Sequence, residues 1–376
     1  MKILISGGHL TPALALIDYL KSQDQKYEIV FVGRLFSQSK LKQLAQEKKE
    51  ITQRKIKFIH LNAAKTPQSN SLLISLKSSI LLIRSIFSSL NIFIKEKPNV
   101  FVSFGGYLAI PLAVAAKLTN TPIITHEQTH AAGFANQIIA KFANKIAISY
   151  PTSMAYFPRK KTVLTGNPIR SEILKKSSPQ PSWVKNKLNK PILLVAGGNQ
   201  GSQIINQVIE ASLLHLTKEW TVVHLCGSST YSFNYKDQLQ AALEKLPPDQ
   251  QKNYYIQEWI SGQDMTWIYS HAQAAISRAG ANTTMELTLK NIPTIFIPLP
   301  KAHHNEQLKN AQSLEKQRAA LLLTQENFSS KSLMTKLNQL KADREDIVNN
   351  LKQVKITTNA NQNLYQLITS LAPHAA

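Results

Sequence analysis

Short apolar runs alternate with longer stretches of helical spacing along the whole chain. Each run is rich in Ile, Leu, Val and Phe, which is typical of strands in a parallel sheet covered on both faces. The runs expected to form strands are 2–6, 27–33, 57–61, 100–104, 122–128, 146–149, 163–165, 192–196, 221–226, 254–259, a run ending at 276, and 294–298. Because the alternation restarts after Pro168, the sequence predicts an α/β protein with two Rossmann-like domains.

Some segments follow a helical pattern instead. The segment between the second and third runs is charged and helical, and 309–355 is expected to form helices with solvated faces. Asn361 to Leu371 carries apolar residues at helical spacing, which predicts a last helix.

The most apolar stretch, 72–94, repeats large side chains at alternating steps of three and four residues, which predicts an amphipathic helix with a wide apolar face. Lys77, Arg84 and several serines interrupt it, so it falls short of a membrane span. Two interpretations stay open. The helix is packed in the core, or it dips into an acidic membrane surface beside Lys95 and Lys97.

Composition narrows the setting and the partners. Lys and Arg number 44 against 22 Asp and Glu, so the formal charge of +22 favours an anionic partner. Nucleic acid, acidic phospholipid and a diphosphate substrate all qualify, and general solubility explains the charge equally well. Cys226 is the single cysteine, which excludes a disulfide framework and fits a reducing, cytosolic setting. The opening run is too short for a secretory signal.

The stretch 276–310 combines a strand, a tight Arg278-Ala279-Gly280 turn and a helix that Asn282 or Thr283 is expected to cap. Free N–H groups and the positive end of the helix dipole make such a turn an anion site. Glu286, one turn inside the helix, lies where the ribose of a nucleotide diphosphate would be. Strand, turn and helix also occur in every parallel α/β protein as plain structure.

Two further glycine turns and a polar strand end mark the first half. Gly7 and Gly8 precede His9, and Gly105 and Gly106 precede Tyr107, each after an expected strand. The strand 122–128 ends in His-Glu-Gln, three polar residues that are costly to bury without a purpose.

The order of residues in these segments resembles the MurG family, the N-acetylglucosaminyltransferases of peptidoglycan precursor synthesis. The donor-binding segment of that family is similar to R-A-G-x-N-T-x-x-E at 278–286, with P-L-P and Q-x-x-N-A following. The first glycine turn, F-G-G-Y, H-E-Q with G-x-x-N-x-x-x-A, G-N-P-I-R and G-G-N-Q-G-S also match. These motifs extend from Gly7 to Asn310, so the resemblance covers nearly the whole chain.

The resemblance implies the GT-B fold, two Rossmann-like domains facing a cleft. Residues 1–167 would bind the lipid acceptor and associate with the membrane, 168–354 would bind UDP-GlcNAc, and 355–376 would form a helix that packs back on the first domain. The implied reaction transfers GlcNAc from UDP-GlcNAc to the C4 hydroxyl of undecaprenyl-diphosphate-MurNAc-pentapeptide (lipid I), with inversion, giving lipid II. The protein would lie on the cytoplasmic side of the cell membrane, held peripherally by the helix near 72–94, with no nucleic acid partner.

The resemblance also assigns residues. His9 is the expected base, since a neutral imidazole takes a proton near pH 7, and Glu127 is the alternative. The implied acceptor-binding residues are Gly7, Gly8, Gly105, Gly106, Tyr107 and His126. The implied donor-binding residues are Thr129, Arg170, Asn199, Ile260, Ala281, Asn282, Thr283, Glu286, Glu306 and Gln307. With no D-x-D motif in the sequence, we expect no cofactor and no obligatory metal; helix N-termini and Arg170 would stabilise the leaving diphosphate.

The chain departs from the family pattern in places. The first glycine turn lacks a Gly-Thr pair, Ala109 and Ile110 replace Ser-Gly, and Thr129 stands where the family usually has Asn. A related GT-B enzyme acting on a different lipid therefore stays an alternative, as do a UDP-GlcNAc epimerase, which H-E-Q speaks against, and a non-enzymatic basic nucleic-acid binder.

Overall fold

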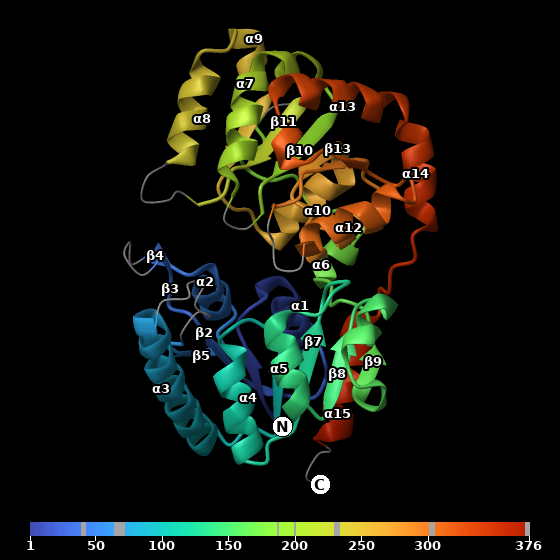
Figure 1. Cartoon of the computed structure of the whole chain (residues 1–376). Coiled ribbons are helices and arrows are strands. Elements are labelled where there is room, and N and C mark those ends of the chain that lie inside the picture. Colours follow the sequence, from blue (N-terminus) through green and yellow to red (C-terminus); the bar gives the residue numbers. More distant parts are fainter. Residues whose placement is uncertain are drawn as a thin grey trace. The chain divides into compact units, whose positions relative to one another are not determined.

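The computed structural model describes residues 1–38, 43–63, 72–185, 188–198, 201–228, 234–300 and 305–372. Contacts within the chain define two units (Figure 1), which we describe one at a time. Unit 1 comprises Met1–Ser171 together with Thr357–Ala376, and unit 2 comprises Glu172–Ile356.

Unit 1 is built on a seven-stranded parallel sheet in the order β5-β2-β1-β6-β7-β8-β9. Its strands are β1 (Lys2–Ser6), β2 (Glu28–Gly33), β5 (Lys57–His60), β6 (Val100–Ser103), β7 (Ile123–Glu127), β8 (Lys145–Ile148) and β9 (Thr162–Leu164). Most inner positions are buried on both faces, as their near-continuous apolar sequence predicts.

Helices cover both faces of this sheet (Figure 1). They are α1 (Leu10–Lys21), α2 (Gln46–Gln53), α3 (Leu72–Glu96), α4 (Ala109–Leu118), α5 (Phe134–Phe142) and α15 (Ala360–Leu371), with the 3-10 turns η2 (Pro151–Tyr156) and η3 (Arg159–Lys161). One core cluster joins the sheet to α3, α4 and α5, and the other joins it to α1 and α15.

The last helix is anchored to the end of the first long segment of unit 1. Asn361 Nδ2 donates to the carbonyl of Ile169 at 2.7 Å, and Asn363 Nδ2 donates to that of Thr165 at 3.0 Å. Between them Gly166 has a φ of +83°, and a Cβ there would lie 2.6 Å from Cβ of Thr357. Only glycine therefore fits at this contact.

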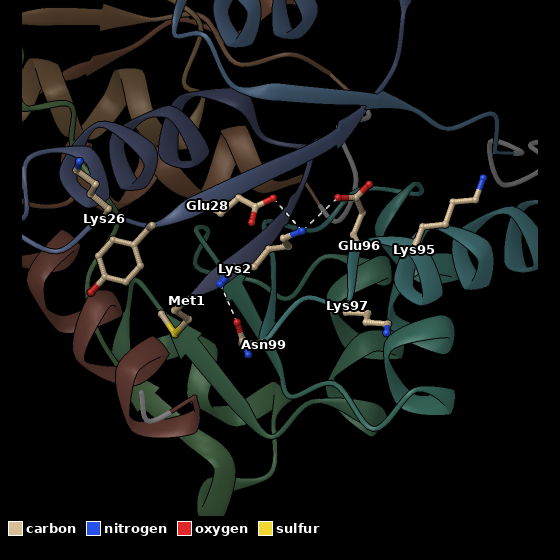
Figure 2. Close-up of a pocket in the computed structure, with 9 residues that line it drawn as sticks. Met1, Lys2, Lys26, Glu28, Lys95, Glu96, Lys97 and Asn99 are labelled. Atoms are coloured by element: carbon tan, nitrogen blue, oxygen red, sulfur yellow. Dashed lines mark hydrogen bonds and ion pairs between the residues drawn. The ribbon is translucent and has the colours of Figure 1, made fainter. Parts of the chain in front are cut away.

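Charged side chains join the amino ends of three strands in unit 1 to the carboxyl end of α3 (Figure 2). Lys2 Nζ lies 2.8 Å from Glu28 Oε1 of β2 and 3.6 Å from Glu96 Oε2 at the end of α3. Glu96 is nearly buried and also accepts from Lys57 Nζ of β5 at 2.7 Å. Asn99 Oδ1 accepts from the backbone N–H of Lys2 at 2.7 Å. This network lies at the edge of the sheet opposite the glycine turns.

Unit 2 repeats the architecture on a six-stranded parallel sheet in the order β12-β11-β10-β13-β14-β15. Its strands are β10 (Ile192–Ala196), β11 (Thr221–Leu225), β12 (Tyr254–Gln257), β13 (Ala272–Ser277), β14 (Thr294–Phe296) and β15 (Leu321–Leu322). Its helices are α6 (Ser171–Leu174), α7 (Gln203–Glu219), α8 (Tyr235–Glu244), α9 (Pro248–Gln251), α10 (Gly262–His271), α11 (Ala281–Leu289), α12 (Glu306–Glu315), η5 (Gln325–Asn327), α13 (Ser330–Ala342) and α14 (Arg344–Gln353).

The predicted pair of Rossmann-like domains is confirmed, with two local corrections. The segment between β2 and β5, expected to be helical, also contains the antiparallel pair β3 (Phe36–Gln38) and β4 (Gln43–Leu44). The segment 309–355, expected to show solvated helix faces, contains the edge strand β15 and a buried stripe on α13. Short edge strands carry too few residues to show a period of their own.

A buried polar chain links α7, β11 and β12 in unit 2. His224 lies 3.0 Å from Asn206 Oδ1 through Nε2 and 2.7 Å from the Tyr254 hydroxyl through Nδ1. Asn206 Nδ2 donates to the carbonyl of Cys226 at 3.1 Å, so Asn206 Oδ1 accepts and His224 carries its proton on Nε2. Burial lowers the pKa of His224 to about 3, and the ring is neutral.

This neutral histidine makes unit 2 sensitive to acid. The unfolded chain binds a proton at His224 near pH 6.5, whereas the folded chain binds it only near pH 3. As the pH falls below 6.5, the free energy of unfolding should therefore decrease, by up to about 1.4 kcal/mol per pH unit from this residue. Denaturant titrations of unit 2's transition at several pH values should give a shallower pH slope for His224→Gln. The control, exposed His215→Gln on α7, should keep the wild-type slope; equal slopes for both variants would contradict this account.

Candidate active site

The two glycine turns of unit 1 pack against each other at the carboxyl edge of its sheet. A Cβ on Gly8 would lie 2.2 Å from the carbonyl oxygen of Gly105, and one on Gly106 would lie 2.9 Å from Cα of Gly8. The preceding strands, β1 and β6, are neighbours in the sheet, and the strand order reverses between them. Open α/β sheets bind ligands at this point. The structure therefore brings the two predicted acceptor-binding turns together. The backbone N–H of Gly7 also donates to the carbonyl of Val32 at 2.6 Å.

His9 follows the first turn as the N-cap residue of α1, and its side chain makes no capping hydrogen bond. The residue as a whole is exposed. Surrounding protein atoms nevertheless desolvate it and lower the pKa of His9, while the negative charge of Glu127 acts in the opposite direction. A neutral imidazole not used for capping is suited to accepting a proton.

Glu127, at the end of β7, holds the loop that follows. Its Oε1 accepts from the backbone N–H of Thr129 at 3.0 Å and from the Thr129 hydroxyl at 2.8 Å. Its Oε2 accepts from the Gly133 N–H at 2.8 Å and from Asn136 Nδ2 at 2.9 Å. Both carboxylate oxygens are therefore occupied by groups of the loop that Glu127 holds. The geometry therefore favours His9 over Glu127 as the base.

Two predicted binding residues beside Glu127 are turned into the fold. His126 is 1% exposed, its Nε2 lies 3.0 Å from the carbonyl of Gly166, and burial lowers its pKa to about 4. Thr129 is 4% exposed, and its hydroxyl also contacts the carbonyl of Ala131. In this conformation both side chains support the loop, and their contacts with acceptor and sugar stay predictions.

Asn136 on α5 connects this loop to the second glycine turn. Its Oδ1 accepts from the Thr125 hydroxyl at 2.7 Å, and its Nδ2 donates to the carbonyl of His126 at 3.1 Å. A Cβ on Gly105 would lie 3.1 Å from the same amide. The G-x-x-N spacing identifies Asn136, but its bridging role becomes visible only once the strands are placed side by side.

A second cluster beside the glycine turns has no sequence signal. Glu47 is 4% exposed and accepts from the backbone N–H of Arg34, whose Nε lies 3.6 Å from the same carboxylate oxygen. Built Cβ atoms on Gly7 and Gly33 would each lie 3.0 Å from Glu47. Burial raises the pKa of the half-buried Tyr107 phenol, and its hydrogen bond with Arg34 works against that shift. Arg34 precedes the β3–β4 pair and Glu47 follows it, so no contiguous sequence motif contains both residues.

In unit 2 the residue before α11 is Gly280, and the described residues leave space where its side chain would lie. Gly280 is the N-cap residue of α11, with an ordinary φ of −64°, and a Cβ there would have no described atom within 4 Å. Neither the backbone conformation nor the packing of the described residues requires glycine at this position. Because Gly280 has no side chain, a ligand can approach the backbone N–H groups of Ala281, Asn282 and Thr283. The expectation that Asn282 or Thr283 caps the helix is wrong, because the helix begins at Ala281.

Glu286, one turn further along α11, is 4% exposed and accepts from the Tyr269 hydroxyl of α10 at 3.0 Å. This hydrogen bond orients the carboxylate proposed to bind the ribose. The sequence pattern does not single out Tyr269, because it lies on a different helix.

Side chains of α12 hold the loop after β14 and the turn after β13. Gln307 Oε1 accepts from the Leu299 N–H at 3.0 Å, and Asn310 Nδ2 donates to the carbonyl of Ala279 at 3.0 Å. Glu306 begins α12, and Ile260 follows β12 and is 6% exposed.

Two remaining predicted donor residues fall elsewhere. Asn199 lies outside the described residues. Arg170 lies in unit 1, directly before α6.

Curated relatives match nearly the whole chain. A protein of Clostridium botulinum (strain Langeland) is 31% identical over 98% of both chains, and one of Clostridium tetani is 31% identical over 98% of this chain and 97% of its own. Both are named UDP-N-acetylglucosamine–N-acetylmuramyl-(pentapeptide) pyrophosphoryl-undecaprenol N-acetylglucosamine transferase. The chain belongs to the MurG family of glycosyltransferases.

Family models and solved structures agree with this membership. Residues 6–148 match the glycosyltransferase family 28 N-terminal domain, and residues 192–367 match the C-terminal domain. Acinetobacter baumannii MurG is similar in fold, with a TM-score of 0.66 and 23% identity over 98% of this chain and 99% of its own. A kitacinnamycin glycosyltransferase (TM-score 0.68, 14% identity, 99% and 98% covered) and the UDP-GlcNAc 2-epimerase of Neisseria meningitidis (0.65, 15%, 98% and 100%) share the fold alone. The predicted MurG family, GT-B fold and enzyme class are confirmed.

The open helix end gives a direct test of the donor site. Gly280→Ala adds one methyl group in an ordinary backbone conformation, so thermal stability should stay at the wild-type value. That methyl group would occupy the approach to the N–H groups of α11, and we expect UDP affinity to fall about tenfold or more, from loss of charge-assisted hydrogen bonds. Calorimetric titration with UDP measures the effect. Undiminished affinity would place the diphosphate elsewhere.

Proposed function

We propose that this MurG-family protein transfers GlcNAc from UDP-GlcNAc to the C4 hydroxyl of lipid I, with inversion at the sugar, to give lipid II. The observation that carries the proposal is the 31% identity over 98% of the chain to relatives named for this transfer. The structural neighbour named as an epimerase shares the fold alone, and neither the matching family models nor the relatives named above favour the basic-binder alternative.

Unit 2 is proposed to bind the donor. The α11 N-terminus receives the diphosphate through the N–H groups of Ala281 to Thr283, which stabilise negative charge as UDP departs. Glu286, oriented by Tyr269, accepts hydrogen bonds from the ribose hydroxyls. The backbone of Ile260 contacts the uracil, Glu306 and Gln307 contact the sugar, and Asn199 adds a phosphate contact. Arg170, which belongs to unit 1, stays a predicted phosphate contact.

Unit 1 is proposed to bind the acceptor at its paired glycine turns. The C4 hydroxyl oxygen attacks the anomeric carbon as the bond to UDP breaks, and the hydroxyl proton passes to the imidazole of His9. Glu127 keeps its loop in place and puts a negative charge near His9, which stabilises the imidazolium that forms.

Helix α3 contacts the core through Phe93, but it leaves most of its other large apolar side chains on the outer surface. Ser85 and Ser89 face the interior with at most 1% exposure, whereas Ile83 and Phe87 are 54% and 68% exposed. Other large apolar side chains on the outer surface of α3 are Ile80, Leu81, Leu82 and Ile94. Among the described residues no helix is long and apolar enough to cross a bilayer.

This outer surface supports peripheral membrane binding. Exposed apolar side chains bordered by the cations Arg84 and Lys95 fit insertion into the interface of an anionic bilayer. We propose that α3 holds the enzyme on the cytoplasmic face of the membrane, where the lipid acceptor is presented.

Transfer of radiolabelled GlcNAc to a short-chain lipid I analogue tests the reaction, with UDP-glucose and UDP-galactose as parallel donors. Labelled disaccharide from UDP-GlcNAc alone is expected. Binding of UDP-GlcNAc without transfer would point to a different lipid acceptor, the alternative that the shortened first turn and Thr129 keep open.

His9→Ala should lower kcat about 100-fold to 10,000-fold, the usual contribution of a general base. The Kd for UDP-GlcNAc should stay unchanged, because His9 lies in unit 1 and serves the acceptor. Steady-state kinetics with the same analogue provide kcat, and calorimetry provides the Kd. Turnover close to wild type would remove His9 from the mechanism.

The membrane role of α3 predicts that replacing Ile83 and Phe87 together by serine abolishes most binding to vesicles containing anionic phospholipid, since each buried apolar side chain contributes about 1.5–3 kcal/mol. Turnover of the short-chain analogue should persist. Leu214→Ser, at an exposed leucine of α7, is the matched control and should bind vesicles normally. Vesicle flotation measures the binding of both variants. If the double variant binds vesicles as well as the wild type does, the outer surface of α3 is not the membrane-binding surface.

A further inference from the structure

Arg278 is a buried cation at the carboxyl edge of the sheet in unit 2. It directly follows β13, and only 7% of the residue is exposed. Its backbone N–H donates to the carbonyl of Ala196 at the end of β10 at 3.1 Å. The residue therefore lies at the reversal point of the strand order, where the turns leading into α7 and α11 begin.

The guanidinium binds four neutral acceptors from three separate segments. Nη1 donates to the carbonyls of Ile297 and Pro298 at 3.0 and 3.1 Å. Nη2 donates to the hydroxyl of Ser202, the N-cap residue of α7, at 2.7 Å, and to Gln325 Oε1 of η5 at 2.8 Å. Arg278 thus holds together the loop after β14, the start of α7 and the turn after β15.

No carboxylate in the described part of the chain neutralises this charge. Neighbouring Glu326 is exposed and forms no ion pair with Arg278 among the described residues. Burial lowers the pKa of Arg278 to about 10, with no acidic group opposing the shift. A buried cation satisfied only by dipoles is unfavourable unless an anion compensates it.

We propose that Arg278 is a positioning residue whose counter-ion is the diphosphate of the bound nucleotide, so that the free protein carries an uncompensated buried charge that the ligand neutralises. The proposal rests on the proposed function, in which the diphosphate lies at the α11 N-terminus. All four N–H groups of the Nη atoms are occupied, so the guanidinium acts through its charge and through the segments it holds.

The nearest test is to supply the missing counter-ion within the protein. Gln325→Glu keeps the size of the side chain and its oxygen beside Nη2, and adds one negative charge 2.8 Å from the guanidinium. We expect the variant to unfold at a higher temperature than wild type without ligand. We expect its Kd for UDP to rise about tenfold or more, while its Kd for uridine, which carries no phosphate, changes less than about twofold.

Two further variants complete the design. Gln240→Glu adds the same charge to the same unit on an exposed position of α8 and should leave both affinities unchanged. Arg278→Lys retains the charge and loses the fork geometry, so stability should fall while the preference for UDP over uridine stays within about threefold of wild type. Calorimetric titrations with UDP and uridine, and thermal melts, provide every readout.

The outcomes separate this inference from the proposed function. If Gln325→Glu binds UDP as tightly as wild type, or loses UDP and uridine in equal proportion, Arg278 is a purely structural clamp. If Arg278→Lys loses the preference for UDP over uridine while Gln325→Glu keeps it, the preference depends on the fork geometry of the guanidinium and not on its charge, and the proposal is wrong. If the wild-type protein binds neither UDP nor UDP-GlcNAc, the proposed function itself fails, whatever the variants do.

Discussion

The reversal of strand order beside one central strand determines where chemistry takes place in each unit. β1 has β2 on one side and β6 on the other, and β10 has β11 and β13 in the same way. Chain segments leaving two adjacent strand ends then run in opposite directions, which opens a crevice that no connection crosses. The proposed base His9 follows β1, and the proposed phosphate-binding residues Ala281, Asn282 and Thr283 follow the turn after β13.

In each unit a buried charged side chain holds loops beside the crevice. The charge is negative in unit 1 and positive in unit 2. In unit 1 the Glu127 carboxylate gathers N–H and O–H groups of the loop it precedes. In unit 2 the Arg278 guanidinium gathers carbonyl and side-chain oxygens from segments distant in sequence. A charged side chain forms stronger hydrogen bonds than a neutral one, and it can therefore hold loops that contribute no side chain to the apolar core. The signs match the proposed partners: a cation near a diphosphate and an anion near a histidine that gains a proton.

Sequence alone predicts the strands of both sheets except the two-residue edge strand β15, because apolar runs buried on both faces leave a clear pattern, as in Lys2–Ser6 and Ile192–Ala196. It also identifies the glycine turns and the site residues that belong to contiguous motifs. Contacts such as Tyr269 to Glu286, or Arg278 to Gln325, join segments whose proximity is set by the order of strands, and no local pattern encodes them. The N-cap of α11 was mispredicted for a different reason: capping preferences favour Asn and Thr, whereas an open phosphate site favours a residue without a side chain.

The route of the chain has a consequence for synthesis. Unit 2 is inserted within unit 1, whose two parts end at Ser171 and begin again at Thr357. Leu364 and Ile368 of α15 are fully buried in the same core as α1 and β1, which are made first. On the ribosome, therefore, unit 2 has its complete sequence before unit 1 does, and the face of the first sheet that α1 covers stays partly exposed until α15 emerges. The domain that begins first is the one that finishes last, and its exposed apolar face is a place where chaperones would be needed.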